Sequence, residues 1–219
     1  MGGSGRAGGG STSVGGVHPP GYEPMLASSG PGRRTSDFAF EPKLDGWRAV
    51  VHVTGAKIAV YTRPGREVAA SVPELAGLAD VVPDGTVLDG ELVAGSGRPS
   101  SFYRLGTLLA TRPGERSRRA TFVAFDVLTV GGRRMVDQPY EERRALLESL
   151  LLAGPAWCTV SQWTDVELVD LLEACNRLEI EGLVGKRLGS RYRPGERSGD
   201  WVKVKTAAWR TMHGPYRHR

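Results

Sequence analysis

The sequence has little cysteine, little lysine and no long apolar run. Its two cysteines, Cys158 and Cys175, form neither a disulfide framework nor a metal-binding spacing, which excludes a secreted disulfide scaffold and a zinc ribbon. No apolar stretch approaches the ~18 residues that a membrane-spanning helix needs. The Gly- and Ser-rich start lacks the apolar core of a signal peptide. We therefore expect a cytoplasmic protein with no membrane partner.

Lysine is scarce: only five of the 29 Lys and Arg residues are lysine. Arginine stays protonated in proteins, whereas lysine can lose its proton and act as a nucleophile. The five lysines therefore indicate where to look for chemistry. The net charge of +5 also lies entirely within residues 181–219. Such an excess indicates a phosphate-rich partner, nucleic acid or nucleotide, although a solvated basic tail gives the same pattern.

Hairpin and helix patterns alternate without a βαβ rhythm, which predicts an α+β fold. Thr54-Gly55 separates two alternating runs and predicts a hairpin. Two capping-box patterns, 71–74 and 164–167, predict the starts of helices that end near residues 79 and 177. Pro139 predicts the start of a third helix. We expect further strands near residues 38–49, 86–93, 121–128, 183–187 and 201–205.

The turn around Asp45-Gly46 brings an amine, a carboxylate and a guanidinium within six residues, 43–48. Only about 0.1% of an ordinary lysine is neutral near pH 7.4, so a nucleophilic Lys43 needs burial or neighbouring cations. Lys203 and Lys205 would point to one face of a strand and could supply that positive field. The alternatives are a surface turn and a solvated edge strand, which lysines often protect.

Two carboxylates lie beside strand-like segments. Glu91 follows Asp89-Gly90, and Glu181 precedes the run that ends at Lys186. Together they could hold a divalent metal ion against phosphate oxygens. Each could equally be an ordinary salt-bridge partner.

Taken in order, these segments resemble the covalent nucleotidyltransferases: ATP-dependent DNA ligases, with RNA ligases and mRNA-capping enzymes as relatives. The nucleophile motif Lys-x-Asp-Gly-x-Arg is matched by residues 43–48. Within this family the sequence is most similar to the ligase domains of bacterial end-joining ligases, at residues 24–27 and 190–195. The other matching motifs are residues 62–67, 88–93, 122–126, 181–186 and 201–205.

The resemblance implies a catalytic domain of antiparallel sheets flanked by helices. Lys43 would attack the α-phosphate of ATP to form lysyl-AMP, and Asp45 would serve the later attack by a 3′-hydroxyl. Phe125 would stack on adenine, unless it is only a core residue, and Glu41 would recognise the adenine edge. The remaining implied roles are ribose binding by Arg48 and Glu91, contact with phosphates or the nicked strand by Arg63, charge neutralisation by Lys186, Lys203 and Lys205, and Mg²⁺ or Mn²⁺ binding by Glu181 and Glu91.

The resemblance also implies a domain organisation. Residues 1–23 are Gly- and Ser-rich and predict a disordered tail. Residues 24–205 would form the adenylation domain, and residues 206–219 a short basic tail that contains Trp209. Ligases of this type continue into an OB-fold domain of roughly 80–100 residues. Because residues 206–219 are too few to form such a domain, we expect a catalytic domain alone.

The function expected from these residues is that of an ATP-dependent DNA ligase catalytic domain in DNA repair and recombination. Its partners would be nicked or broken double-stranded DNA and end-joining proteins such as Ku. We expect a monomer in a bacterial cytoplasm, associated with the nucleoid. The alternatives are an RNA-directed nucleotidyltransferase and a truncated domain that only binds nucleic acid.

Overall fold

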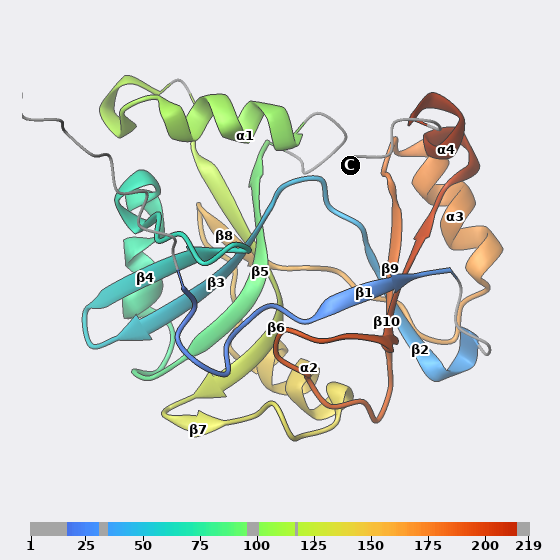
Figure 1. Cartoon of the computed structure of the whole chain (residues 1–219), viewed down its shortest axis with the longest axis horizontal. Helices are drawn as coiled ribbons and strands as arrows, with labels where there is room; N and C mark the ends of the chain where they lie inside the picture. Colours follow the sequence, from blue (N-terminus) through green and yellow to red (C-terminus); the bar gives the residue numbers. More distant parts are fainter. Residues whose placement is uncertain (1–16, 31–34, 96–100, 117, 214–219) are drawn as a thin grey trace, which may run out of the picture.

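Two β-sheets with helices on their outer sides form the protein (Figure 1). The computed structural model describes residues 17–30, 35–95, 101–116 and 118–213. The smaller sheet has the strand order β1-β10-β9-β2, and the larger has the order β4-β3-β5-β6-β7 with β8 paired to β6. Most neighbouring strands are antiparallel, while β1–β10 and β6–β8 are parallel. The predicted α+β class is confirmed.

The helices and strands follow one another without a βαβ repeat. The strands are β1 Leu26–Ser29, β2 Phe38–Pro42, β3 Trp47–Thr54, β4 Lys57–Thr62, β5 Val87–Ala94, β6 Ala120–Val130, β7 Arg133–Arg134, β8 Trp157–Thr159, β9 Gly182–Arg187 and β10 Arg197–Lys205. The α-helices are α1 Ser101–Ala110, α2 Tyr140–Ser149, α3 Leu168–Arg177 and α4 Ala207–His213. Short 3-10 helices are η1 Thr35–Asp37, η2 Ala69–Ser71, η3 Pro73–Asp80 and η4 Pro113–Glu115.

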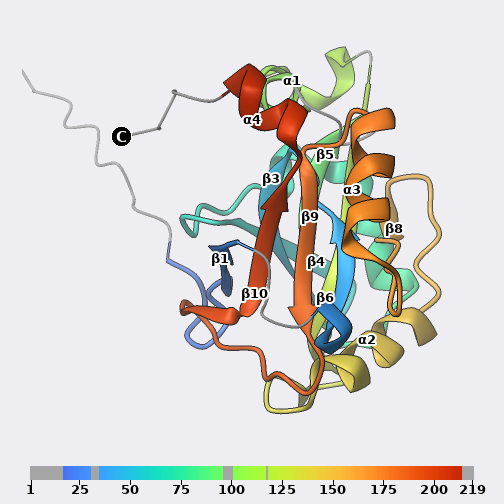
Figure 2. The ribbon, with the colours of Figure 1, turned by 90° about the vertical axis from the view of Figure 1, so that its right-hand side faces the viewer.

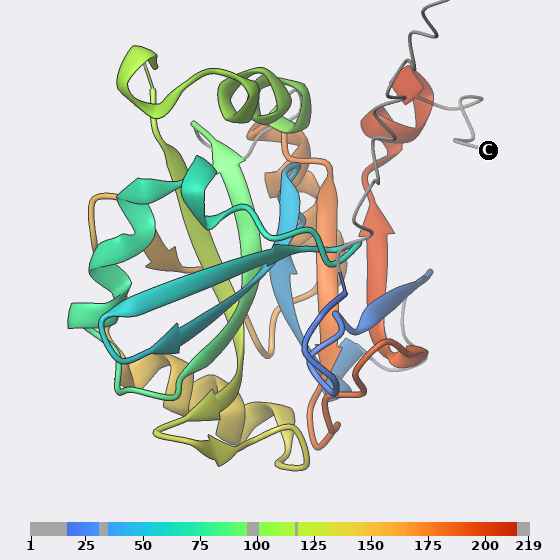
Figure 3. The same ribbon diagram turned by 60° about the vertical axis from the view of Figure 1, so that its left-hand side comes forward.

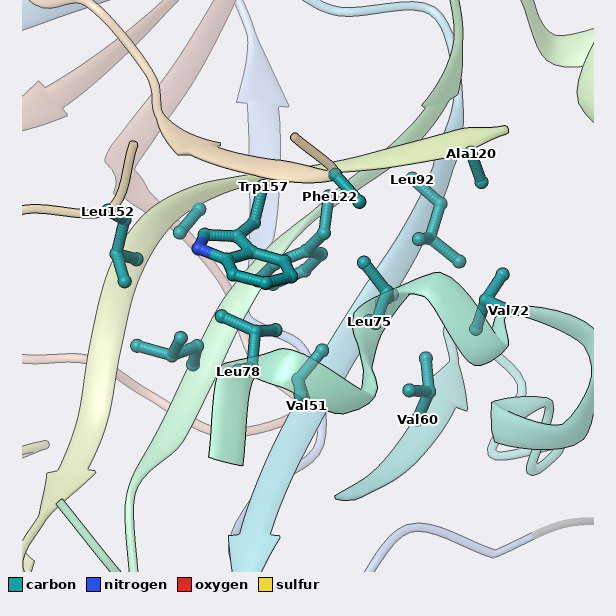
Figure 4. Packing of buried hydrophobic residues seen from close by; sticks show 14 of the residues in the cluster. Val51, Val60, Val72, Leu75, Leu78, Leu92, Ala120, Phe122, Leu152 and Trp157 are labelled. Carbon is teal, nitrogen blue, oxygen red and sulfur yellow. The ribbon is translucent and has the colours of Figure 1, made fainter. Parts of the chain in front are cut away.

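The core of the larger sheet lies beneath η3. Alternate residues of β3, β5 and β6 point to this face and meet Leu75 and Leu78 of η3 (Figure 4). Trp157 of β8 belongs to the same cluster, and its ring lies against η3 at Gly77. An added Cβ at Gly154 would lie 2.3 Å from the Trp157 ring, so only glycine fits there. This packing supports β3 and β5, whose neighbouring residues Arg48 and Glu91 line the candidate site.

The smaller sheet has a separate core. Helix α3 covers its outer face, as Figure 2 shows, and packs Leu171 and Cys175 against Phe38, Phe40 and Leu183. On the other edge β1 lies along β10 (Figure 3). The two sheets therefore have their own apolar support, and their strand ends can meet at a shared polar site.

The two helices predicted to end near residues 79 and 177 are confirmed, but neither begins with a capping-box hydrogen bond. Helix η3 begins at Pro73 without a side-chain cap, and Glu74 instead accepts the backbone N–H of Ala120 at 2.7 Å. Helix α3 begins at Leu168, beyond the predicted box at 164–167. A carboxylate that can reach a long-range backbone donor does not need to cap its own helix, which local spacing cannot reveal.

Ordered contacts extend beyond the limits predicted for the central domain. His18 is buried, and its Nε2 donates to the backbone oxygen of Arg63 at 3.1 Å, so residues before 24 pack on the fold. Residues 1–16 of the predicted tail lie outside the described residues. At the other end Ala207–His213 form α4, and residues 214–219 lie outside the described part. Among the helices described, none has the length and apolarity to cross a membrane.

Candidate active site

A cavity of about 640 Å³ lies between the two sheets. All four strands of the smaller sheet and strands β3, β4, β5 and β6 of the larger sheet contribute residues to it. Asp45, Glu181 and Lys205 are not among its lining residues. Eight of the predicted site residues line this one cavity: Glu41, Lys43, Arg48, Arg63, Glu91, Phe125, Lys186 and Lys203.

Lys43 follows β2 directly and lies beside β9. Its backbone N–H donates to the carbonyl of Gly182 at 2.8 Å. Its Nζ lies 2.5 Å from Oε2 of Glu181, while Lys205 Nζ lies 2.8 Å from Oε1 of the same carboxylate. Burial acts to raise the pKa of Glu181, but the two ammonium groups hold it below its usual value. The carboxylate is thus an anion shared by two lysines.

Glu41 and Lys186 form a second, fully buried ion pair. Lys186 Nζ lies 3.0 Å from Glu41 Oε2 and donates to the backbone oxygen of Phe125 at 2.6 Å. Tyr140 and Arg144 of α2 donate to Glu41 Oε1 at 2.8 and 3.3 Å. Burial raises the pKa of Glu41 and lowers the pKa of Lys186, since each charged form loses hydration. The pair therefore depends on its complete set of partners.

Arg48 lies on β3 and is held by a carboxylate of the neighbouring strand. Its Nε and Nη2 donate to the two oxygens of Asp89, both at 2.5 Å. Tyr192 adds a third donor to Asp89 at 2.6 Å. The guanidinium lies over the rings of Phe125 and Trp201, 4.5 and 5.3 Å from their centroids. Asp89 and the two rings fix the position of Arg48 at the cavity wall.

Phe125 and Glu91 line the cavity from β6 and β5. The Phe125 ring is half-buried, with Lys186 Nζ 4.3 Å from its centroid. Glu91 Oε1 accepts the backbone N–H of Gly46 at 3.2 Å. Burial raises the pKa of Glu91 to about 7, although Arg48 and Lys43 act to lower it. An uncharged Glu91 can both donate and accept a hydrogen bond in the cavity.

Asp45 points to the start of α1. The backbone N–H of Phe102 lies 3.5 Å from Asp45 Oδ2, at the N-terminal end of the helix. The structure therefore places Asp45 beside α1 and outside the cavity that holds most of the other predicted residues. Arg63 and Lys203 do line the cavity, from the segment after β4 and from β10.

Several partners of the site were not predicted from sequence. Asp89 lies within the motif at 88–93, so its position could have suggested a role. Tyr140 and Arg144 lie in α2, 99 and 103 residues after Glu41 in the sequence. Tyr192 lies 103 residues from Asp89. No local pattern signals such pairs.

The carboxylates fit a metal ion that arrives with phosphates better than a preformed metal cage. The described ranges contain no group of three or more His, Cys, Asp or Glu side chains that could hold a metal. Mg²⁺ commonly binds proteins through one or two carboxylates together with substrate phosphates and water. Glu181 could serve in this way because both its oxygens already attract cations.

Two sheets that enclose one pocket, with an ion-paired lysine directly after β2, match the covalent nucleotidyltransferase fold. The ligase domain of Mycobacterium tuberculosis LigD superposes with a TM-score of 0.71 at 36% identity, covering 84% of this chain and 60% of that one. A mycobacterial DNA ligase D complexed with ATP and MES gives a TM-score of 0.70 at 35% identity, with the same coverage.

The chain belongs to the ATP-dependent DNA ligase domain family, whose family model matches residues 24–205. The multifunctional non-homologous end joining protein LigD of Mycobacterium bovis is 37% identical over 194 residues, which cover 86% of this chain and 24% of the relative. A DNA ligase of Thermococcus onnurineus is 33% identical over 187 residues, which cover 78% of this chain and 32% of the relative. The chain thus spans about a quarter to a third of these relatives.

Proposed function

We propose that this chain is the catalytic domain of an ATP-dependent DNA ligase and that Lys43 is its nucleophile. The observation that carries the proposal is the position of the Lys43 ammonium. It is partly exposed at the cavity and bound to Glu181, which also binds Lys205. Lys186 also lines the cavity, but its side chain is buried and paired with Glu41.

In the first step, Lys43 Nζ loses a proton and attacks the α-phosphorus of ATP. A P–N bond forms as the P–O bond to pyrophosphate breaks, which leaves lysyl-AMP. Such in-line transfer depends on positioning and on neutralising charge. Lys203 at the cavity wall, Lys186 and Lys205 would neutralise the phosphate.

The remaining cavity residues would orient the nucleotide. Glu41 would recognise the adenine edge and Phe125 would stack on the ring, while Glu91 and Arg48 would bind the ribose. Because Arg48 is already bound to Asp89 through two hydrogen bonds, it would act from a fixed position. Arg63 would contact phosphates or the nicked strand.

A divalent ion, Mg²⁺ or Mn²⁺, would accompany the nucleotide. Glu181 and Glu91 are the carboxylates that would hold it, and the ion would supply further neutralisation of phosphate charge. Since the ammonium nitrogen of Lys43 becomes the uncharged nitrogen of a phosphoramidate, Glu181 would then lose one of its two cationic partners.

The acceptor would be the 5′-phosphate at a nick or break in double-stranded DNA. Lysyl-AMP would pass AMP to this phosphate, and a 3′-hydroxyl would then displace AMP in a step served by Asp45. The mycobacterial relatives are named as end-joining proteins, which supports repair of broken DNA over RNA as the task. A monomer that works with end-joining proteins such as Ku, in the bacterial cytoplasm beside the nucleoid, fits this task.

The test is covalent labelling by ATP that carries the label on its α-phosphate. Purified protein, Mg²⁺ and labelled ATP are incubated and separated on a denaturing gel beside Lys43→Ala and Lys43→Arg. We expect acid-labile label on the wild type alone, because arginine stays protonated. Label on either variant would identify another nucleophile.

A second measurement separates the steps. Nicked DNA that already carries a 5′-adenylate is supplied without ATP. Sealing by wild type that does not label itself would assign only the last step to this chain. If the folded protein neither labels itself nor seals the adenylated nick, the proposed function is contradicted.

A further inference from the structure

The short helix α4 is attached to the site through Thr206. The Thr206 backbone N–H donates to the carbonyl of Glu181 at 3.1 Å, and its hydroxyl accepts the backbone N–H of Trp209 at 3.1 Å. The second contact is an N-cap, in which a side-chain oxygen satisfies a free N–H of the first helical turn. Thr206 is buried, so the start of α4 is fixed against the residue that binds both lysines.

This attachment places an aromatic ring over a lysine of the site. Trp209 lies four residues after Lys205, and the Lys205 Nζ lies 3.3 Å from the centre of its ring. The same ammonium lies 2.8 Å from Glu181 Oε1. The Arg210 side chain donates to the backbone oxygen of Lys205 at 3.0 Å. Three contacts therefore restrict Lys205: Arg210 binds its backbone oxygen, and the Trp209 ring and the Glu181 carboxylate contact its ammonium.

The contacts continue to the candidate nucleophile. Glu181 uses one oxygen for Lys205 and the other for Lys43, so the orientation of its carboxylate depends on both lysines. A lysine side chain is flexible, and about 29% of that of Lys205 is exposed. A ring that restricts the Lys205 ammonium thereby restricts Glu181, and Glu181 in turn restricts Lys43.

We infer that Trp209 is a positioning residue for adenylate transfer, which acts on Lys43 through Lys205 and Glu181. The inference rests on the proposed function, since it assigns Trp209 to the same site. Trp209 lies in the segment that the sequence suggested was only a basic tail. Its ring would stabilise a cation next to the carboxylate without contacting the nucleotide.

The first test measures single-turnover labelling by α-labelled ATP over a range of ATP concentrations. We expect Trp209→Ala to lower the maximum rate roughly three- to tenfold, the loss of one cation–π contact, and to leave the KM for ATP within about twofold. Trp209→Phe keeps an aromatic face and should retain most of the rate. Thr211→Ala, on the same helix, should match wild type because its hydroxyl contacts only the Ala207 carbonyl in the described structure.

A double-mutant cycle separates positioning from a general effect on folding. In a Lys205→Met background the ring has no ammonium to hold, so Trp209→Ala should cause no further loss of rate. Additive losses would overturn the inference, as would a Trp209→Ala variant with the maximum rate of wild type.

Lysine NMR keeps the test independent of activity. Only five lysines occur, so their ε-methylene signals in protein labelled with ¹³C-lysine can be assigned by single substitutions. We expect an upfield ring-current shift for Lys205 that disappears in Trp209→Ala. Absence of that shift would overturn the inference even if labelling occurs. A wild type with the shift but no labelling would contradict the proposed function and leave the contact established.

Discussion

The Nζ atom of Lys43 lies 2.5 Å from Oε2 of Glu181, a carboxylate that is 4% exposed. The second oxygen of Glu181 is bound to Lys205. One buried anion thus balances two ammonium groups that come from the ends of β2 and β10. This arrangement brings a lysine to the cavity with a defined direction, whereas an isolated surface lysine would sample many rotamers.

Glu181→Gln should slow self-adenylation at least about tenfold, a loss of about 1.4 kcal/mol in transition-state stabilisation. Glutamine keeps the shape of the side chain but removes the charge that holds both lysines. Labelling rates measured beside Glu173→Gln provide the comparison, since Glu173 is exposed on α3 and pairs only weakly with Arg177 at 3.9 Å. Equal rates in the two variants would contradict a role for the Glu181 charge.

The same carboxylate should affect stability in acid. The folded protein holds the pKa of Glu181 below its ordinary value, so its stabilising effect is present above about pH 4.5 and is lost as the pH falls through the lower folded-state pKa. Wild type should therefore lose its advantage over Glu181→Gln as the pH is lowered from 6 toward 3. Thermal unfolding at a series of pH values measures this difference, and a constant difference would show that the charge does not contribute.

Removing one partner of the buried Glu41–Lys186 pair should destabilise the protein more than replacing both partners by uncharged residues. Removing one partner leaves a charge without compensation in the core, which costs about 3–5 kcal/mol. Glu41→Gln and Lys186→Met should each be strongly destabilised in urea unfolding. The double variant should recover part of that loss because no unpaired charge remains. A double variant destabilised by the sum of the two single effects would show that the two side chains act independently.

Local signals in the sequence predicted many elements correctly. The hairpin predicted at Thr54-Gly55 is present, and Gly55 and Ala56 join β3 to β4. A glycine at φ 55° suits a tight hairpin turn, and alternation sets which residues face inward. The segments predicted as strands at 183–187 and 201–205 are paired strands. These features depend on residues close to one another in the chain, which is why pattern alone sufficed.

Contacts between distant segments were not predictable in this way. Three different parts of the chain supply Arg48, the Asp89 carboxylate that binds it and the Tyr192 hydroxyl that binds Asp89. Strand β1 pairs parallel with β10, about 170 residues away, and its short sequence carries little strand signal. Helix α1 was not predicted, because it directly follows residues 95–100, whose Gly, Ser and Pro content is typical of a loop. The resemblance to a family supplied the candidate residues, but not the partners that hold them.

Glu91 should make stability fall as the pH rises toward neutrality. Burial raises its pKa to about 7 from an ordinary value of 4.5, so the folded state prefers the protonated carboxyl. That preference is fully present below about pH 4.5 and is lost as the pH rises through 7. Glu91→Gln removes this titration and should therefore gain stability relative to wild type between pH 5 and pH 8. Melting temperatures across that range test the direction, and a gain in the opposite sense would refute the raised pKa.

Tyr192→Phe should destabilise the fold and slow labelling together. The Tyr192 hydroxyl donates to Asp89 at 2.6 Å and accepts the buried backbone N–H of Met25 at 2.9 Å. Its removal leaves that N–H without its partner and frees one oxygen of the carboxylate that orients Arg48, at a cost of about 1–3 kcal/mol. This corresponds to a fall of roughly 2–10 °C in Tm for a chain of this size.

The matched control for this change is Tyr103→Phe, which deletes the same hydroxyl from a side chain that is 72% exposed on α1. It should leave Tm unchanged, because an exposed hydroxyl exchanges its hydrogen bonds with water. Scanning calorimetry and the labelling rate are measured on both variants. If Tyr192→Phe were stable but slow, Asp89 would orient Arg48 only for nucleotide binding; if it were as stable and as fast as Tyr103→Phe, the Tyr192–Asp89–Arg48 contacts would not hold the site together.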